Sequence, residues 1–223
     1  MKKKFISLIF LSGGVGSRID STIPKQYIKI HGKPIALYSF ETFLKIDLID
    51  EIIVVCNDKY KNIFKTNKKL KFSSPGSRRQ DSVYNALLMI DNLSDYVCIH
   101  DAARPFIDRE SIIKTIDAAI EYNASALGHL AANTIKKLDK NKTVKETLDR
   151  SFLFEIQTPQ VIQTSLLKKG YEYINKNKIN VFDDLSIIES LNTKIKIIEG
   201  KKENFKITHP IDLKFAKYLL NEK

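Results

Sequence analysis

The stretch FISLIFLSGG, residues 5–14, decides the fold. Its first seven residues are apolar except for one serine, and they lead directly into Ser12-Gly13-Gly14. A short run of this kind predicts a strand buried on both faces, as in the parallel sheets of α/β proteins. The glycines that follow predict a loop whose backbone can come close to a ligand, because no Cβ stands in the way.

The same pattern recurs along the chain, in alternation with helical periodicity. Apolar runs at 51–57 and 96–100 predict further strands, and helices are predicted after Pro34, from Asp81 and behind the capping residue Asp108. Alternating strands and helices form parallel sheets with right-handed crossovers. We therefore predict an α/β fold with a Rossmann-like, mostly parallel sheet and helices on both faces. In the last third we predict helices near 165–175, 183–191 and 210–221 and strands near 194–199 and 204–208.

One segment departs from this pattern. Around a polar centre at 139–142, Ile135 and Leu138 on one side and Val144 and Leu148 on the other predict a β-hairpin. We expect residues 133–151 to protrude as an arm from a single domain spanning 1–223. A lone two-stranded hairpin is marginal in water, so we expect the arm to dock on a partner, most simply a second copy of the chain in a homodimer.

Composition restricts the class of protein. The 223 residues are 43% hydrophobic and 28% charged, which excludes a mainly disordered chain. No apolar run reaches the roughly 18 residues of a membrane span. The start resembles a signal peptide, but no small-x-small cleavage site is present, so we expect none. The two cysteines, Cys56 and Cys98, lie within apolar runs and lack metal-site spacing. They predict buried thiols in a reducing cytoplasm.

The positive charge points to an anionic partner. The chain has 37 basic and 26 acidic residues, a formal net charge of +11. A nucleic acid is one alternative. The lysines are scattered, however, rather than gathered with aromatic residues on one face. This favours a small phosphorylated substrate, and we expect neither nucleic acid nor a membrane as partner.

The loop after the first strand carries the main candidate chemistry. Ser12-Gly13-Gly14-Val15-Gly16-Ser17-Arg18 could present backbone N–H groups to phosphate oxygens, although it lacks the Rossmann fingerprint and a Walker lysine. A plain tight turn is the alternative. Arg18 and, seven residues later, Lys25 add two cations beside the loop, which suits a triphosphate of about four negative charges.

Several motifs occur together in one order: LSGGVGSR at 11–18, PKQY at 24–27, GSRRQDSV at 76–83, HDAARP at 100–105, LDR at 148–150, QTPQ at 157–160 and FKIT at 205–208. The set covers essentially the whole chain and closely resembles the 2-C-methyl-D-erythritol 4-phosphate cytidylyltransferases of the non-mevalonate isoprenoid pathway. The ribitol 5-phosphate cytidylyltransferases share many of these motifs and are the alternative. The chain departs from the usual pattern at Leu11-Ser12-Gly13, Ser77 and Asn133.

The resemblance implies roles for individual residues. Arg18 and Lys25 match catalytic cations that grip the CTP phosphates. The loop residues Ser12, Gly13, Gly14 and Gly16, together with Gly76 and Ser82, match nucleotide-binding positions. Asp101 and Lys206 match residues that bind the polyol phosphate. Thr134 and Arg150 match arm residues that reach this substrate across a dimer interface.

The implied reaction is the transfer of CMP from CTP to the acceptor, with release of pyrophosphate. The acceptor phosphate is itself the nucleophile, so the protein needs to supply positioning and positive charge. We expect Mg²⁺ as cofactor, held mainly by the CTP phosphates, and no protein metal ligands. His100, Arg104 and the pair Asp183-Asp184 are interpreted as structural residues.

Overall fold

The computed structural model describes residues 3–14 and 23–221. Its β-strands are β1 (Ile6–Leu11), β2 (Lys29–Ile30), β3 (Lys33–Pro34), β4 (Glu51–Val55), β5 (Lys69–Ser73), β6 (Tyr96–Asp101), β7 (Ala124–Leu130), β8 (Ile135–Leu138), β9 (Val144–Leu148), β10 (Phe154–Gln163) and β11 (Lys196–Glu199). Its α-helices are α1 (Ile35–Leu44), α2 (Arg79–Leu87), α3 (Arg109–Tyr122), α4 (Thr164–Lys176) and α5 (Pro210–Asn221). Its 3₁₀ helices are η1 (Lys25–Tyr27), η2 (Asp58–Ile63), η3 (Arg150–Phe152), η4 (Leu185–Ile187) and η5 (Glu189–Leu191).

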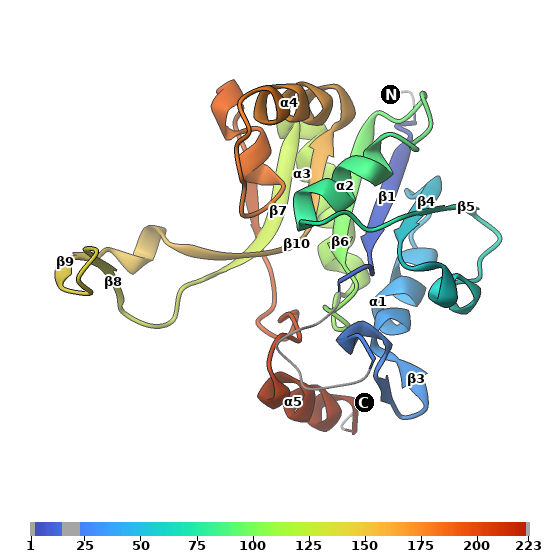
Figure 1. Ribbon diagram of the computed structural model, residues 1–223, viewed down its shortest axis with the longest axis horizontal. Helices are drawn as coiled ribbons and strands as arrows, with labels where there is room; N and C mark the ends of the chain where they lie inside the picture. Colours follow the sequence, from blue (N-terminus) through green and yellow to red (C-terminus); the bar gives the residue numbers. More distant parts are fainter. Residues whose placement is uncertain (1–2, 15–22, 222–223) are drawn as a thin grey trace.

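A seven-stranded sheet forms the centre of the molecule (Figure 1). The strand order is β11-β7-β10-β6-β1-β4-β5. Strand β10 runs antiparallel to both of its neighbours, and the remaining adjacent pairs in this sheet are parallel. The predicted α/β fold with a mostly parallel sheet is confirmed.

Helices cover both faces of the sheet because β1 is apolar on both sides. Leu8 and Phe10 pack with residues of α1 and α3, whereas Ile9, which points the other way, packs with residues of α2 and α4. In Figure 1, α2 and α4 lie in front of the sheet and α3 lies behind it. Phe10 is fully buried and meets the ring of Phe40 edge-on at a centroid distance of 5.5 Å. Burial of each such side chain contributes about 1.5–3 kcal/mol.

The strand order places a ligand crevice at one end of the sheet. From β1 the chain moves outward through β4 to β5, and then returns to the opposite side of β1 as β6. Ligands of open α/β sheets bind at such a reversal, beyond the carboxyl ends of the strands. Here β1 and β6 end side by side, with Leu11 paired with Asp101.

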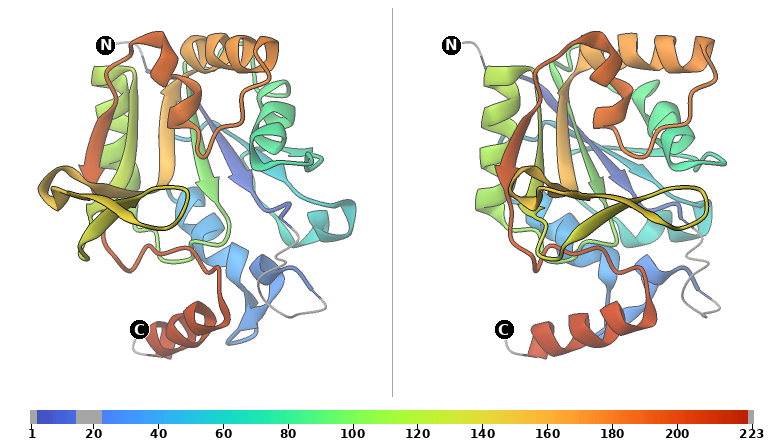
Figure 2. Two further views of the ribbon diagram at one scale, coloured as in Figure 1. Left: turned by 60° about the vertical axis from the view of Figure 1, so that its left-hand side comes forward. Right: turned by 90° about the vertical axis from the view of Figure 1, so that its left-hand side faces the viewer.

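The predicted hairpin is present as β8 and β9, an antiparallel pair that forms a sheet of its own. It projects from the central sheet as an arm in Figure 1 and is turned towards the viewer in Figure 2. At the carboxyl end of the central strands lie the β2–β3 pair and α5. Within the described residues, no helix is both long and apolar enough to cross a membrane.

Two predicted elements are wrong. Residues 183–191 form the short turns η4 and η5 instead of one helix, and this keeps Asp184 buried where it pairs with Arg79. Residues 204–208 form no strand, because their polar groups bind the neighbouring loops. There the Asn204 side chain donates to the carbonyl of Thr158, and the N–H of Ile207 donates to Ala103.

Candidate functional site

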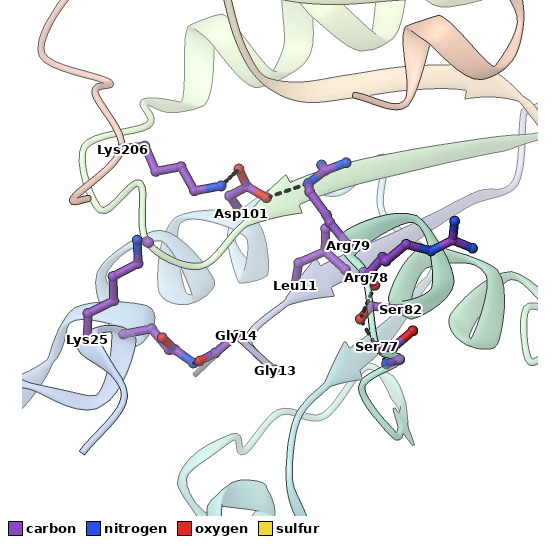
Figure 3. A pocket seen from close by; sticks show the side chains of 13 residues that line it. Leu11, Gly13, Gly14, Lys25, Ser77, Arg78, Arg79, Ser82, Asp101 and Lys206 are labelled. Atoms are coloured by element: carbon purple, nitrogen blue, oxygen red, sulfur yellow. Dashed lines mark hydrogen bonds and ion pairs between the residues drawn. The ribbon is translucent and has the colours of Figure 1, made fainter. Parts of the chain in front are cut away.

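A cavity of about 330 Å³ opens beyond the carboxyl ends of β1 and β6 (Figure 3). The turn after β1, the turn η1, the start of α2, and the ends of β6 and of the 201–207 segment meet there. The lining residues are Leu11, Gly13, Gly14, Lys25, Gln26, Gly76, Ser77, Arg78, Arg79, Ser82, Asp101, Ala103 and Lys206. Five of them are basic or acidic, and four of those five are cations.

The structure brings most of the candidate site residues together. Those that line the cavity are Gly13, Gly14, Lys25, Gly76, Ser82, Asp101 and Lys206. Ser12 is buried next to them, in hydrogen-bond contact with Tyr27. Gly16 and Arg18 lie outside the described residues. Thr134 and Arg150 lie on or beside the arm and do not line this cavity; Arg150 borders a separate cleft with His129 and Lys202.

The turn after β1 needs glycine at one position for packing. A Cβ on Gly13 would lie 2.5 Å from Cγ of Pro75, whereas a Cβ on Gly14 would meet no atom of the described residues within 4 Å. The close approach of Pro75 brings the second glycine turn, at 75–77, against the first. The open space at Gly14 leaves its backbone accessible from the cavity.

The second turn leads directly into α2. Asp81 accepts hydrogen bonds from the N–H and the guanidinium of Arg78, and Ser82 Oγ accepts the N–H of Gly76 at 2.9 Å. A Cβ on Gly76 would lie 2.4 Å from Cβ of Asp81, so only glycine fits this tight corner. The turn therefore places the N-terminus of α2 at the cavity, where the helix dipole favours an anion.

Asp101 is the acidic centre of the cavity (Figure 3). It accepts from Lys206 Nζ at 2.7 Å and from Arg79 Nε at 3.2 Å, and Arg104 Nε lies 4.0 Å away. Burial alone would raise the pKa of Asp101, but these three cations outweigh it and hold the pKa well below its usual value. Asp101 therefore remains a carboxylate that accepts hydrogen bonds and is a poor proton acceptor in catalysis.

Arg79 is a site residue that sequence reasoning missed. Its guanidinium bridges Asp101 and, through Nη2 at 2.7 Å, the fully buried Asp184. Burial would lower the pKa of Arg79, but the two carboxylates raise it, so the charge is fixed. Arg79 stands inside the GSRRQDSV motif, but its partner Asp184 lies 105 residues away in the sequence. No local pattern pairs them.

The residues interpreted as structural have structural contacts. His100 is fully buried, and burial lowers its pKa to about 3, so the ring is neutral. Its nitrogens contact the carbonyl of Arg104 and the hydroxyl of Thr158. Arg104 donates to the carbonyl of Asn204 at 2.8 Å. Asp184 is occupied by its ion pair with Arg79.

The donor set does not favour a protein-held metal. Across residues 3–14 and 23–221, no group of three or more His, Cys, Asp or Glu side chains is arranged to hold a metal ion. The acidic residue that lines the cavity, Asp101, already has both oxygens on cations. A metal at this site would need ligands from a bound substrate, such as phosphate oxygens.

The sheet is doubly wound, and its pocket combines two glycine turns, a helix N-terminus and several cations. These features are typical of nucleotide-binding enzymes. Comparison with known families gives the particular one. The family model described as "IspD: 2-C-methyl-D-erythritol 4-phosphate cytidylyltransferase" matches residues 6–222, and the chain belongs to this family.

Individual relatives agree. The chain is 44% identical, over its full length and 77% of the relative's, to a protein of Oryza sativa subsp. japonica named 2-C-methyl-D-erythritol 4-phosphate cytidylyltransferase, chloroplastic. It is 40% identical to a protein of that enzyme name from Clostridium beijerinckii, covering 96% of this chain and 98% of the relative.

Solved structures give the same result. The 4-diphosphocytidyl-2C-methyl-D-erythritol synthase of Anaerococcus prevotii matches with a TM-score of 0.89 at 28% identity, over 99% of this chain and all of the other. The 2-C-methyl-D-erythritol 4-phosphate cytidylyltransferase of Francisella tularensis matches with a TM-score of 0.82 at 32% identity, over 96% and 99%.

Proposed function

We propose that this protein transfers the CMP group of CTP to 2-C-methyl-D-erythritol 4-phosphate, forming 4-diphosphocytidyl-2-C-methyl-D-erythritol for isoprenoid precursor synthesis. The observation that carries the proposal is the cavity between the two glycine turns, where Lys25, Arg79 and Lys206 meet in a chain of this family. The ribitol 5-phosphate and nucleic-acid alternatives gain no support from these relatives.

The proposed chemistry is a substitution at phosphorus. An oxygen of the acceptor phosphate forms a bond to the α-phosphorus of CTP, the bond from that phosphorus to the bridging oxygen breaks, and pyrophosphate leaves. The acceptor phosphate is already deprotonated, so no side chain must remove a proton. This agrees with a cavity that offers cations and a carboxylate of very low pKa but no free imidazole among the lining residues.

Each part of the cavity has a role in this proposal. The Ser12–Gly14 turn and the Gly76–Ser82 corner hold the nucleotide, and Lys25, with Arg18, stabilises the charge that builds on the α-phosphate and the leaving group. Asp101 accepts hydrogen bonds from hydroxyl groups of the polyol, and Lys206 binds its phosphate side. In the structure Lys206 is paired with Asp101, so substrate binding would exchange part of this ion pair for contacts to the acceptor.

Mg²⁺ is proposed as the cofactor, held mainly by the triphosphate oxygens. Among the described residues that line the cavity, Asp101 is the acidic one and already pairs with cations, which is consistent with this arrangement. When bound, the ion would neutralise phosphate charge and favour departure of pyrophosphate. Because Cys56 and Cys98 are free, buried thiols, we further propose that the protein works in the cytoplasm, a reducing compartment.

The arm suggests a homodimer. Leu138, Val144 and Phe152 expose apolar side chains on and beside it, Phe152 to 83%. Thr134 and Arg150 belong to the same region and do not line the cavity of their own chain. We propose that the arm packs on a second copy of the chain and brings these two residues to the partner's cavity. We also propose that residues 1–223 form one nucleotidyltransferase domain.

The proposed reaction is tested with an acceptor panel. Purified protein is incubated with CTP and Mg²⁺ and with either 2-C-methyl-D-erythritol 4-phosphate or ribitol 5-phosphate, and pyrophosphate release and product mass are measured. We expect turnover with the methylerythritol phosphate and little with the ribitol phosphate. Equal or greater turnover with ribitol phosphate, or none with either while a known cytidylyltransferase is active, would contradict the proposal.

The dimer is tested by mixing two inactive variants. Lys25→Ala damages the cavity and Arg150→Ala damages the arm, so a mixed dimer contains one cavity with both parts intact. Subunit exchange is verified with tagged chains. One of the two sites in a mixed dimer is intact, and about half of the dimers in an equal mixture are mixed. We therefore expect about a quarter of wild-type activity to return in the mixture, and about half in purified mixed dimers. Failure of activity to return in mixed dimers would mean that each site is built within one chain.

A further inference from the structure

The side chain of Gln26 is tied to the turn that follows β1. Its amide nitrogen Nε2 donates to the carbonyl of Ser12 at 2.9 Å and to the carbonyl of Gly14 at 2.8 Å. The residue is 3% exposed, so water does not compete for these bonds. Both N–H groups of one amide are therefore used on the two carbonyls that flank Gly13.

Tyr27 supports the same turn. Its hydroxyl donates to the Ser12 carbonyl at 2.7 Å and accepts from Ser12 Oγ at 2.9 Å. Burial raises the pKa of Tyr27, so the hydroxyl keeps the proton that it donates. The ring is held in place by stacking on Tyr60 at a centroid distance of 3.6 Å. The turn η1 thus supplies three donors to two carbonyls.

These contacts fix the direction of the opposite backbone groups. In a trans peptide the C=O and the N–H of the next residue point to opposite sides. Holding the Ser12 carbonyl therefore sets the direction of the Gly13 N–H. Among the described residues, no backbone acceptor takes the N–H of Gly13 or Gly14, and both residues line the cavity.

Glycine makes such a restraint necessary. Two consecutive glycines have more backbone freedom than any other pair, and ordering them costs correspondingly more entropy. Gln26 also follows Lys25 directly in η1, so its two bonds connect the backbone of this lysine to the turn. One side chain therefore fixes both the shape of the turn and its separation from the cation.

We propose that Gln26 is a positioning residue, which holds the Ser12–Gly14 backbone and Lys25 in the arrangement that receives the CTP triphosphate; Tyr27 assists it. The inference rests on the proposed function for the identity of the ligand, but not for the ordering of the turn. Gln26 acts through the backbone that it holds and takes no part in bond making or breaking.

The test compares Gln26→Ala and Gln26→Glu with Gln163→Glu. Glutamate at 26 is nearly isosteric but presents acceptors to two carbonyl oxygens. Gln163 lies at the other end of the sheet, paired with Tyr96 at the start of β6, and is the matched control. For each variant, kcat and KM for CTP are measured with calorimetric CTP binding, and ¹⁵N relaxation gives order parameters for the Gly13 and Gly14 amides.

We expect both Gln26 variants to lose on the order of 10- to 100-fold in kcat/KM for CTP, as the loss of two buried hydrogen bonds implies, with weaker CTP binding and a larger loss for Gln26→Glu. The Gly13 and Gly14 order parameters should fall from about 0.85 towards 0.6, with Gly76 and Gly128 unchanged. Unchanged order parameters, or CTP binding within about threefold of the Gln163→Glu control, would overturn the proposal.

A general loss of packing and a failure to bind CTP give different results from a local loss of order. If order is lost throughout the sheet, Gln26 is a core residue and the positioning role is refuted; Tyr27→Phe, which removes one donor, provides the milder variant for this comparison. If wild-type protein neither binds nor turns over CTP, the proposed function fails. The order parameters of the two glycines still decide whether Gln26 holds the turn.

Discussion

Replacing Asp101 by asparagine tests the electrostatics of the cavity. The substitution keeps the shape of the side chain but removes the charge that faces Arg79, Lys206 and Arg104. Removal of one partner from a buried ion pair costs about 3–5 kcal/mol, because the remaining charge is left without compensation. Where the loss falls in this range depends on the surroundings of each cation.

The three cations differ in what they retain. Arg79 keeps its second partner, Asp184, at 2.7 Å. Lys206 is 34% exposed and can turn to water. Arg104 is 12% exposed, and its Nε has no hydrogen-bond partner among the described residues. The loss should therefore lie at the lower end of the range, about 3 kcal/mol in the free energy of unfolding.

Urea unfolding at pH 7, followed by circular dichroism, measures this loss. The control is Asp47→Asn, whose carboxylate is 94% exposed and 3.8 Å from Arg109, and which should change stability little. The folded-state pKa of Asp101 is depressed, so its contribution is present above the usual value of 3.8 and is lost as the pH falls through the folded pKa. The two curves should therefore converge in acid. A loss below about 1 kcal/mol at pH 7 would refute the reasoning.

Two other substitutions test neighbouring features. The folded-state pKa of His100 is about 3, below its usual 6.5, so its neutral form adds stability above pH 6.5 that is lost as the pH falls. His100→Asn should reduce the slope of the unfolding free energy against pH, between pH 6.5 and about 4, by up to about 1.4 kcal/mol per pH unit. Urea unfolding at a series of pH values measures this slope, and an unchanged slope would contradict the prediction. Gly76→Ala should cost about 1–3 kcal/mol in thermal unfolding and weaken CTP binding, because its Cβ would meet backbone atoms of Asp81 and Ser82. Gly14→Ala, whose new methyl group would meet no described atom within 4 Å, should unfold near the wild-type temperature; equal losses for both would count against the steric argument.

Much of the fold could be predicted because its central strands are apolar on both faces. In strands β1, β4 and β6 this pattern is visible within a few consecutive residues, and in helices α1 to α5 the apolar residues recur at helical spacing. Strands β7 and β10 lack such a pattern. The ASALGHL segment of β7 is rich in small residues, and FEIQTPQVIQ in β10 carries glutamines and a proline, so their places in the sheet depend on pairing with distant strands.

The candidate site divides in the same way. Glycine turns at strand ends and the lysine of PKQY stand out locally, and they do meet at one cavity. The ion pairs of Arg79 with Asp101 and Asp184 join residues 22 and 105 positions apart. Contacts of this kind follow from tertiary packing. The same holds for the backbone contacts of Gln26, which no local pattern indicates although the residue stands within the PKQY motif.

The pairing of Leu11 with Asp101 at the ends of β1 and β6 has a consequence for how two substrates meet. Adjacent strands in a sheet are about 4.8 Å apart, whereas atoms that react must come within about 3–3.5 Å of each other, so groups held at neighbouring strand ends need to move little. In the proposed reaction, the loop that leaves β1 would face the nucleotide and the carboxylate that ends β6 would face the acceptor. The backbone hydrogen bonds between the two strands would then fix the separation of the two binding loops, whichever ligand each loop holds.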